Sequence, residues 1–250
     1  MSGNNSVSRF IGIMGDGSTD REIIAYLVEV ILKGTGNSDN RVTPILLHRQ
    51  NIRDDIDKFW REYQVEEKAD KNTSILNSSF KNLESAVANV LFGATADFEG
   101  HIGRPLTKRE MIILCSDSEK VLRNKDAYFE EWAWMMEKII QRGIEKYYHT
   151  LSGWGHSVEN LPLIVPVIPF PSTDVLIASA KSASEQSVAV RGRKANELKT
   201  SLYGTDNLSS LKPDGLEQHA FIYLTNDNVQ TIYRDIPEVR TLFQTLCCIS

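Results

Sequence analysis

Apolar and polar positions change period early in the chain. Residues 9–14 (RFIGIM) form a short apolar run with β-branched residues, which is typical of a buried strand. After a short loop, the apolar residues of 23–32 recur at helical spacing. Thr19 and Glu22 have the spacing of a capping box, which predicts the start of this helix, and Gly34 predicts its end. The pattern therefore predicts a strand, a tight loop and a helix.

The same alternation continues along the rest of the chain. Further strands are expected at 42–48, 110–115, 163–168 and 221–224, and further helices at 52–66, 83–92, 125–149, 174–180 and 237–246. Polar or Gly- and Pro-rich composition predicts loops at 70–79 and 93–107, and makes 182–199 the best candidate for a mobile loop. Strands that alternate with helices predict an α/β fold with a mostly parallel central sheet flanked by helices. A length of 250 residues suits a single domain over 1–250.

Three of the predicted strands are followed by acidic residues: Asp16 and Asp20 after the first, Asp117 and Glu119 after 110–115, and Asp174 after 163–168. In open parallel sheets, ligands bind at the carboxyl ends of the strands. Carboxylates that gather there repel one another unless a cation neutralises them, and oxygen ligands suit Mg²⁺ or Mn²⁺. The sequence therefore predicts an Mg²⁺ or Mn²⁺ site at this edge of the sheet.

Each of these acids also has an ordinary structural explanation. Asp16 and Asp20 suit a turn and the first turn of a helix, where the helix dipole favours negative charge. Asp117 and Asp174 suit helix N-caps. The loop at 15–19 could instead cradle a phosphate, although it lacks the lysine of a Walker loop and the third glycine of a dinucleotide-binding loop. The acids taken together favour function more than any one of them does alone.

Charge limits the partners that the chain can have. The formal net charge is -5, whereas a protein that relies on non-specific phosphate contacts is usually basic. Any nucleic-acid contact must therefore come from a local patch. The candidates for holding a substrate phosphate are Lys120, Arg191, Arg193 and Lys194. A solvated surface cluster is the alternative explanation for these four residues.

The chain shows no sign of export or of a membrane segment. No apolar run approaches the ~20 residues that span a bilayer, and the polar N-terminus has no apolar core of a signal peptide. The three cysteines have no metal-binding spacing. We therefore expect a cytoplasmic protein with reduced thiols and no membrane contact.

The acidic motifs resemble those of Toprim domains. The segment Asp16-Gly17-Ser18-Thr19-Asp20 is similar to the Glu/Asp-Gly-x-Thr-Asp/Glu segment that follows the first Toprim strand. Asp117-Ser118-Glu119 is similar to the later Asp-x-Asp. The chain more closely resembles a bacterial family of Toprim-like proteins of unknown function, related to the Toprim domains of OLD-type nucleases. Asp174 matches a further acidic position of that family.

The resemblance implies a role for each acid. It gives catalysis to Asp16 and Asp20, with Asp16 in the place of the Toprim glutamate. It places Asp16, Asp117, Glu119 and Asp174 around Mg²⁺. Asp16 is shorter than the usual glutamate and Glu119 is longer than the usual aspartate. The implied activity is metal-dependent hydrolysis of phosphodiesters by a nuclease, and related families work beside an ATPase partner in phage defence.

Three functions remain open from the sequence. The first is an Mg²⁺-dependent nuclease, and the second is a non-catalytic regulatory subunit that keeps the fold and binds an ATPase or another protein. The third is a nucleotide-binding phosphotransferase that uses the Gly-Asp-Gly loop. A homo-oligomer is also open, because Trp132 and Trp134 cannot share one face of a helix, so one of them could mark an oligomer or partner contact.

Overall fold

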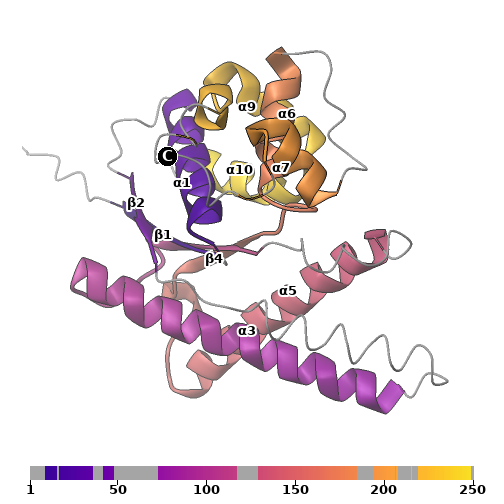
Figure 1. Ribbon diagram of the computed structural model, residues 1–250. Helices are drawn as coiled ribbons and strands as arrows, with labels where there is room; N and C mark the ends of the chain where they lie inside the picture. The colour runs from indigo at the N-terminus through magenta and orange to yellow at the C-terminus, as the bar shows by residue number, and fades with distance from the viewer. Residues whose placement is uncertain are drawn as a thin grey trace, which may run out of the picture.

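The computed structural model describes residues 9–15, 17–35, 42–47, 73–116, 129–184, 194–205, 207, 215 and 219–248, with the side chains at 42–43, 73–80 and 129–136 left aside. A four-stranded sheet lies at its centre (Figure 1). The strands are β1 (Arg9–Met14), β2 (Val42–Leu46), β3 (Met111–Cys115) and β4 (Leu163–Val167). All neighbouring pairs are parallel, in the order β2-β1-β3-β4. The expected α/β fold with a parallel central sheet flanked by helices is therefore confirmed.

Helices cover both faces of this sheet, in three layers (Figure 1). One face carries α1 (Ser18–Gly34), α6 (Asp174–Ser184), α7 (Ala195–Tyr203), α9 (Asn226–Asp235) and α10 (Arg240–Cys247). The other carries α3 (Thr73–Ile102) and α5 (Phe129–Gly153). Short 3₁₀ helices lie at Val158–Asn160, Phe221–Tyr223 and Pro237–Val239. No helix in these described parts is long and apolar enough to cross a membrane.

Two apolar cores follow from the alternation of side chains along the central strands. In β3, Ile113 belongs to the core under α1 and α6, whereas Ile112 and Leu114 belong to the core under α3 and α5. All five residues of β3 are buried, as expected for a strand covered on both faces. The two edge strands each contain a proline, Pro44 in β2 and Pro166 in β4. Because proline has no backbone N–H to donate, it disfavours the pairing of a further strand at each edge of the sheet.

In the core under α3 and α5, which we call the second core, two glycines allow neighbouring elements to pack closely. A Cβ atom added to Gly143 of α5 would lie 2.4 Å from both Cβ and Cγ1 of Val87 in α3. A Cβ atom added to Gly12 of β1 would lie 2.8 Å from Cδ1 of Phe98 and 2.9 Å from Cδ1 of Leu47. These contacts leave no room for a larger residue, so the two glycines set the distance between the helix pair and between helix and sheet.

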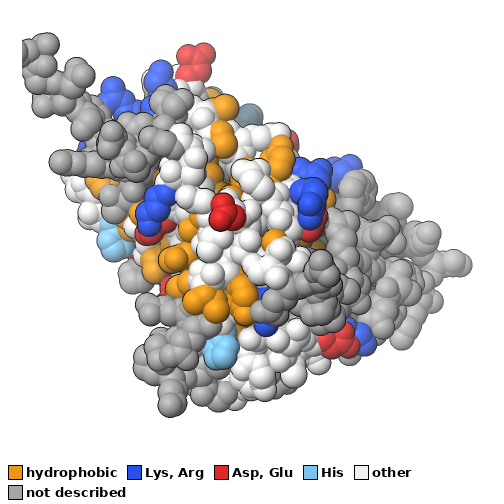
Figure 2. Space-filling view, turned by 90° about the horizontal axis from the view of Figure 1, so that it is seen from above, with side chains coloured by type: hydrophobic (Ala, Val, Ile, Leu, Met, Phe, Trp, Pro, Cys, Tyr) orange, Lys and Arg blue, Asp and Glu red, His pale blue; other side chains and the backbone are white. Residues whose placement is uncertain are grey.

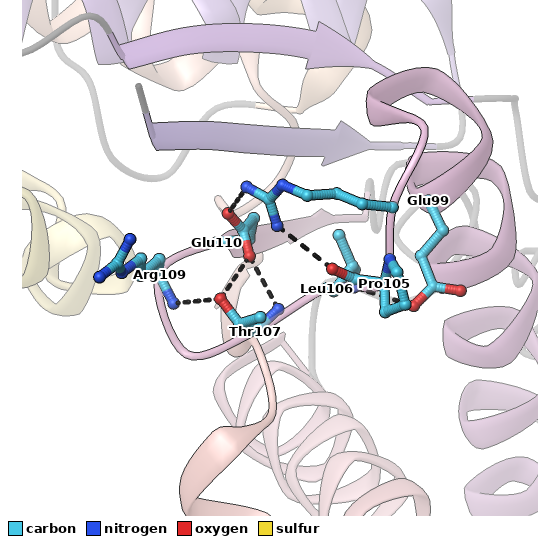
Figure 3. Close-up of polar contacts among 7 residues, drawn as sticks. Glu99, Pro105, Leu106, Thr107, Arg109 and Glu110 are labelled. Carbon is cyan, nitrogen blue, oxygen red and sulfur yellow. Dashed lines mark hydrogen bonds and ion pairs between the residues drawn. The ribbon is translucent and has the colours of Figure 1, made fainter. Parts of the chain in front are cut away.

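A buried carboxylate organises the turn that leads into β3 (Figure 3). The Glu110 carboxylate accepts hydrogen bonds from Nη2 of Arg104 at 2.6 Å and from the backbone N and Oγ1 of Thr107 at 2.7 and 2.8 Å. Leu106 N donates to Oε1 of Glu99 at 2.9 Å. Burial acts to raise the pKa of Glu110, but the hydrogen bonds from Arg104 and Thr107 hold that pKa below its usual range. This cluster stabilises the amino end of the strand, opposite the edge where the acids were predicted.

Several local predictions are wrong. The capping box of Thr19 and Glu22 does not form, because α1 begins at Ser18 with Gly17 as N-cap and without a side-chain cap. Residues 73–79 and 93–102, which were predicted to be loops, belong to α3 (Thr73–Ile102), whereas 103–107 are irregular as predicted and 70–72 lie outside the described residues. Packing explains its long C-terminal part, since Leu91, Ala94 and Phe98 are buried at helical spacing despite the nearby glycines.

The C-terminal third departs further from expectation. The predicted strand at 221–224 is a 3₁₀ helix, and the ring of Phe221 stacks on Tyr26 of α1 at 4.5 Å. Of the mobile loop predicted at 182–199, residues 182–184 belong to α6 and residues 195–199 belong to α7, while 185–193 lie outside the described residues. Helix α9 was not predicted. The helix expected at 52–66 lies outside the described residues.

Candidate functional site

The carboxyl ends of the parallel strands lie along one edge of the sheet. Because β2 and β4 lie on opposite sides of the pair β1–β3, the strand order changes direction between β1 and β3. Ligands of open α/β sheets bind at such a point. Gly15 and Ser116, the residues directly before Asp16 and Asp117, follow these two strands, and a Cβ atom on Gly15 would lie 3.5 Å from the carbonyl oxygen of Cys115.

Two of the predicted acids, Asp20 and Asp174, lie in the described part of the chain, and the structure links them. Asp20 lies in the first turn of α1, and Asp174 is the first residue of α6. Oγ1 of Thr173 donates a hydrogen bond to Oδ1 of Asp20 at 2.5 Å. This bond joins the segments that follow β1 and β4, which are the two strands that flank β3. The first turns of two helices therefore meet at the carboxyl edge.

Asp174 lies in a buried polar cluster. Its Oδ2 accepts from Oγ of Ser172 at 2.9 Å, its Oδ1 accepts from the hydroxyl of Tyr203 at 3.0 Å, and Nζ of Lys199 lies 3.9 Å from Oδ2. Burial raises the pKa of Asp174 to about 6, although Lys199 and the two hydroxyls act to lower it. Burial and the Asp174 charge also raise the pKa of Tyr203, which keeps its hydroxyl a donor. Asp174 is therefore not the N-cap of α6, because it is the first residue of that helix, and its carboxylate anchors α7 instead.

The loop after β1 is shaped around the Asp20 side chain. A Cβ atom on Gly17 would lie 2.7 Å from Oδ2 of Asp20, so a larger residue here would make this carboxylate shift. Arg21 fixes the same loop, because its Nε donates to the carbonyl oxygen of Gly17 at 3.2 Å and its guanidinium also donates to the carbonyl oxygen of Leu47. The glycine in the motif thus has a specific steric reason.

Most of the other predicted site residues lie outside the described part of the chain. Asp16, Asp117, Glu119, Lys120, Arg191 and Arg193 lie outside the described residues. Lys194 is exposed at the start of α7, and its backbone N donates to Oε2 of Glu197 at 3.2 Å. Within the described residues, no three His, Cys, Asp or Glu side chains lie close enough to hold a metal ion. Of the four predicted metal ligands Asp16, Asp117, Glu119 and Asp174, the structure therefore describes only Asp174.

The helical face seen from above carries mixed charge (Figure 2). Basic groups occupy several separate places on it, with acidic and apolar groups between them. The described part of this face thus presents no single basic patch for a nucleic acid.

Sequence reasoning missed four residues of the cluster: Ser172, Thr173, Lys199 and Tyr203. The first two directly precede α6 at the carboxyl end of β4, so the rule that located the acids could have located them too. Lys199 and Tyr203 are four residues apart and share one face of α7. Nothing in the local sequence shows that this face meets Asp174.

No protein-family model, curated protein or solved structure matches this chain. The function of the carboxyl edge is therefore inferred from its own residues.

Proposed function

We propose that this chain is a divalent-metal-dependent nuclease that hydrolyses phosphodiesters at the carboxyl edge of its sheet. The observation that carries the proposal is the hydrogen bond from Thr173 to Asp20, which brings the first turns of α1 and α6 together around the end of β3. It supports a site because acids predicted from separate strands come together where α/β sheets bind ligands. A working partnership with an ATPase in phage defence belongs to the same proposal.

The donor set fits a hard divalent cation. Carboxylate oxygens are the ligands that Mg²⁺ and Mn²⁺ prefer, and we assign them to Asp16, Asp117 and Glu119. A bound Mg²⁺ or Mn²⁺ would supply a Lewis acid that lowers the pKa of water and stabilises charge on the phosphate. Asp20 has a carboxylate oxygen to accept a proton, and the first turns of α1 and α6 direct positive dipole ends toward a phosphate. Asp174 then supports the site by holding Lys199 and Tyr203.

A non-catalytic partner-binding subunit is the second candidate. It is favoured by Asp174, whose two oxygens are both satisfied from within the protein. In this case the polar cluster would serve only to hold α7 against the sheet end.

Cleavage of labelled oligonucleotides separates the two candidates. Single-stranded DNA, duplex DNA and RNA would be incubated with the wild type and with Asp20→Asn and Asp117→Ala, in Mg²⁺ or in Mn²⁺. We expect cleavage of at least one substrate, reduced by about 10²–10⁴-fold in both variants, which is the usual loss when a positioned acid or base is removed. The matched control is Glu145→Ala, an exposed acid on α5 away from the carboxyl edge, which should keep full activity. Equal cleavage by all four proteins, or no cleavage by the wild type, would contradict the nuclease proposal.

A further inference from the structure

The backbone of edge strand β4 has one side that pairs with β3 and one side that faces away from the sheet. Leu163 N donates to the carbonyl oxygen of Glu110 at 3.1 Å, and the carbonyl oxygen of Val167 accepts from the residue after β3 at 3.3 Å. Successive residues of a strand direct their backbone groups to opposite sides. Within β4, the outward-facing residues are therefore Ile164 and Pro166.

Neither outward-facing residue of β4 offers an N–H to a further strand. Pro166 has no N–H, and Ile164 N donates to the hydroxyl of Tyr148 in α5 at 3.1 Å. The same hydroxyl donates to the carbonyl oxygen of Pro162, directly before the strand, at 2.8 Å. Tyr148 thus accepts from one backbone group and donates to another, as the backbone of a neighbouring strand would.

The fold holds this hydroxyl in place. The ring of Tyr148 packs against the second core and lies 5.5 Å from the ring of the fully buried Tyr147. Burial raises the pKa of Tyr148 to about 12, so at neutral pH the hydroxyl keeps the proton that it donates. Leu163, at the start of the strand, is 46% exposed, so solvent and other molecules reach this edge of the sheet.

We propose that the Tyr148 hydroxyl, together with Pro166, prevents β4 from pairing with β4 of a second copy of this chain. An edge strand with unpaired N–H and C=O groups is a template for strand addition. Two β4 strands that meet antiparallel around Ile164 would exchange the N–H and C=O of this residue between the copies. Tyr148 occupies that N–H, and Pro166 removes the next one along the strand. The proposal does not depend on the chemistry of the carboxyl edge.

Substitutions can open this edge without changing the core. Tyr148→Phe keeps the ring and removes the hydroxyl, and Pro166→Val supplies the second outward N–H. In analytical ultracentrifugation, the weight-average mass of the double variant should exceed that of the wild type at the same concentration. It should rise toward twice the wild-type mass as the concentration increases, with a smaller rise for Tyr148→Phe alone. Tyr233→Phe, at a partly buried tyrosine of α9, is the matched control and should keep the wild-type mass.

A charge on the edge shows whether association uses β4. Leu163→Lys, added to the double variant, should restore the wild-type mass, because an exposed lysine on an edge strand opposes pairing. Equal masses of the wild type and the double variant at every concentration overturn the proposal. Association that Leu163→Lys leaves unchanged overturns it as well.

Amide hydrogen exchange tests the hydrogen bond itself in dilute protein. The Ile164 amide should exchange about 10-fold faster in Tyr148→Phe than in the wild type and in Tyr233→Phe, because it has lost its acceptor. An unchanged rate would overturn the role of the hydroxyl. If thermal unfolding shows that the double variant does not fold, the mass and the exchange rate of Tyr148→Phe alone decide the proposal.

Discussion

Gly143→Ala is expected to lower the free energy of unfolding by about 3 kcal/mol, the upper end of the usual cost of overpacking. The added Cβ atom would lie 2.4 Å from two atoms of Val87, and 3.2 Å from the carbonyl oxygen of Glu84. Because Val87 is fully buried and both partners are helices, the clash moves α3 away from α5 and disturbs the second core. Urea denaturation measures the change as a lower midpoint with an unchanged slope.

Gly100→Ala is the matched control, since it makes the same substitution in α3 where nothing lies within 4 Å of the added atom. It should raise the free energy of unfolding by up to about 1 kcal/mol, because alanine is the better helix former. Both substitutions restrict the unfolded chain equally, so the difference between them reports the contact with Val87. Similar effects of the two substitutions would show that α3 and α5 do not pack as closely as described.

Asp174→Asn is expected to remove a pH dependence of stability of about 3 kcal/mol. Burial raises the pKa of Asp174 from 3.8 to about 6 in the folded protein. Between these values the folded state holds a proton that the unfolded state has lost, so the contribution of Asp174 to stability falls as pH rises from about 4 to about 6. The size follows from about 1.4 kcal/mol for each pKa unit. Wild-type stability relative to Asp174→Asn should therefore fall through this window and be constant above it.

The measurement is urea denaturation of both proteins from pH 4 to pH 8. Asp227→Asn, at an exposed position in the first turn of α9, removes the same charge without changing the buried cluster. The difference in free energy of unfolding between the wild type and Asp227→Asn should not fall between pH 4 and pH 6. A flat difference for Asp174→Asn, or one that rises with pH, would mean that the charged form of Asp174 is better accommodated than its burial implies.

The sheet was predictable because its strands carry strong local signals. The run at 9–14 forms β1 with the expected bounds, and 110–115 and 163–168 each differ from β3 and β4 by one residue. Parallel strands that are covered on both faces appear in the sequence as short, nearly continuous apolar runs, and this pattern distinguishes them from amphipathic helices and from half-exposed strands. Because the predicted strands were parallel, the acids that follow them were expected at one edge of the sheet. Asp20 and Asp174 lie at that edge.

The remaining features depend on contacts that no local pattern records. Helix α3 extends well beyond its predicted bounds because it packs along α5 and the sheet, which outweighs the weak helix preference of its serines and glycines. The hydrogen bonds from Thr173 to Asp20 and from Tyr203 to Asp174 join residues 153 and 29 positions apart. Such pairs follow from the assembled fold, which explains why the acids were anticipated and their supporting residues were not.

Divalent-metal binding tests the central claim most directly. Calorimetric titration with Mn²⁺ would compare the wild type with Asp117→Ala and with the exposed control Glu145→Ala, and thermal unfolding would be followed with and without the metal. A ligand that binds only the folded state raises stability by mass action, so the two readouts should agree. We expect Mn²⁺ to bind and stabilise the wild type and Glu145→Ala, and to do neither with Asp117→Ala. Absence of binding by the wild type, or binding unchanged in Asp117→Ala, would contradict the metal site at the carboxyl edge.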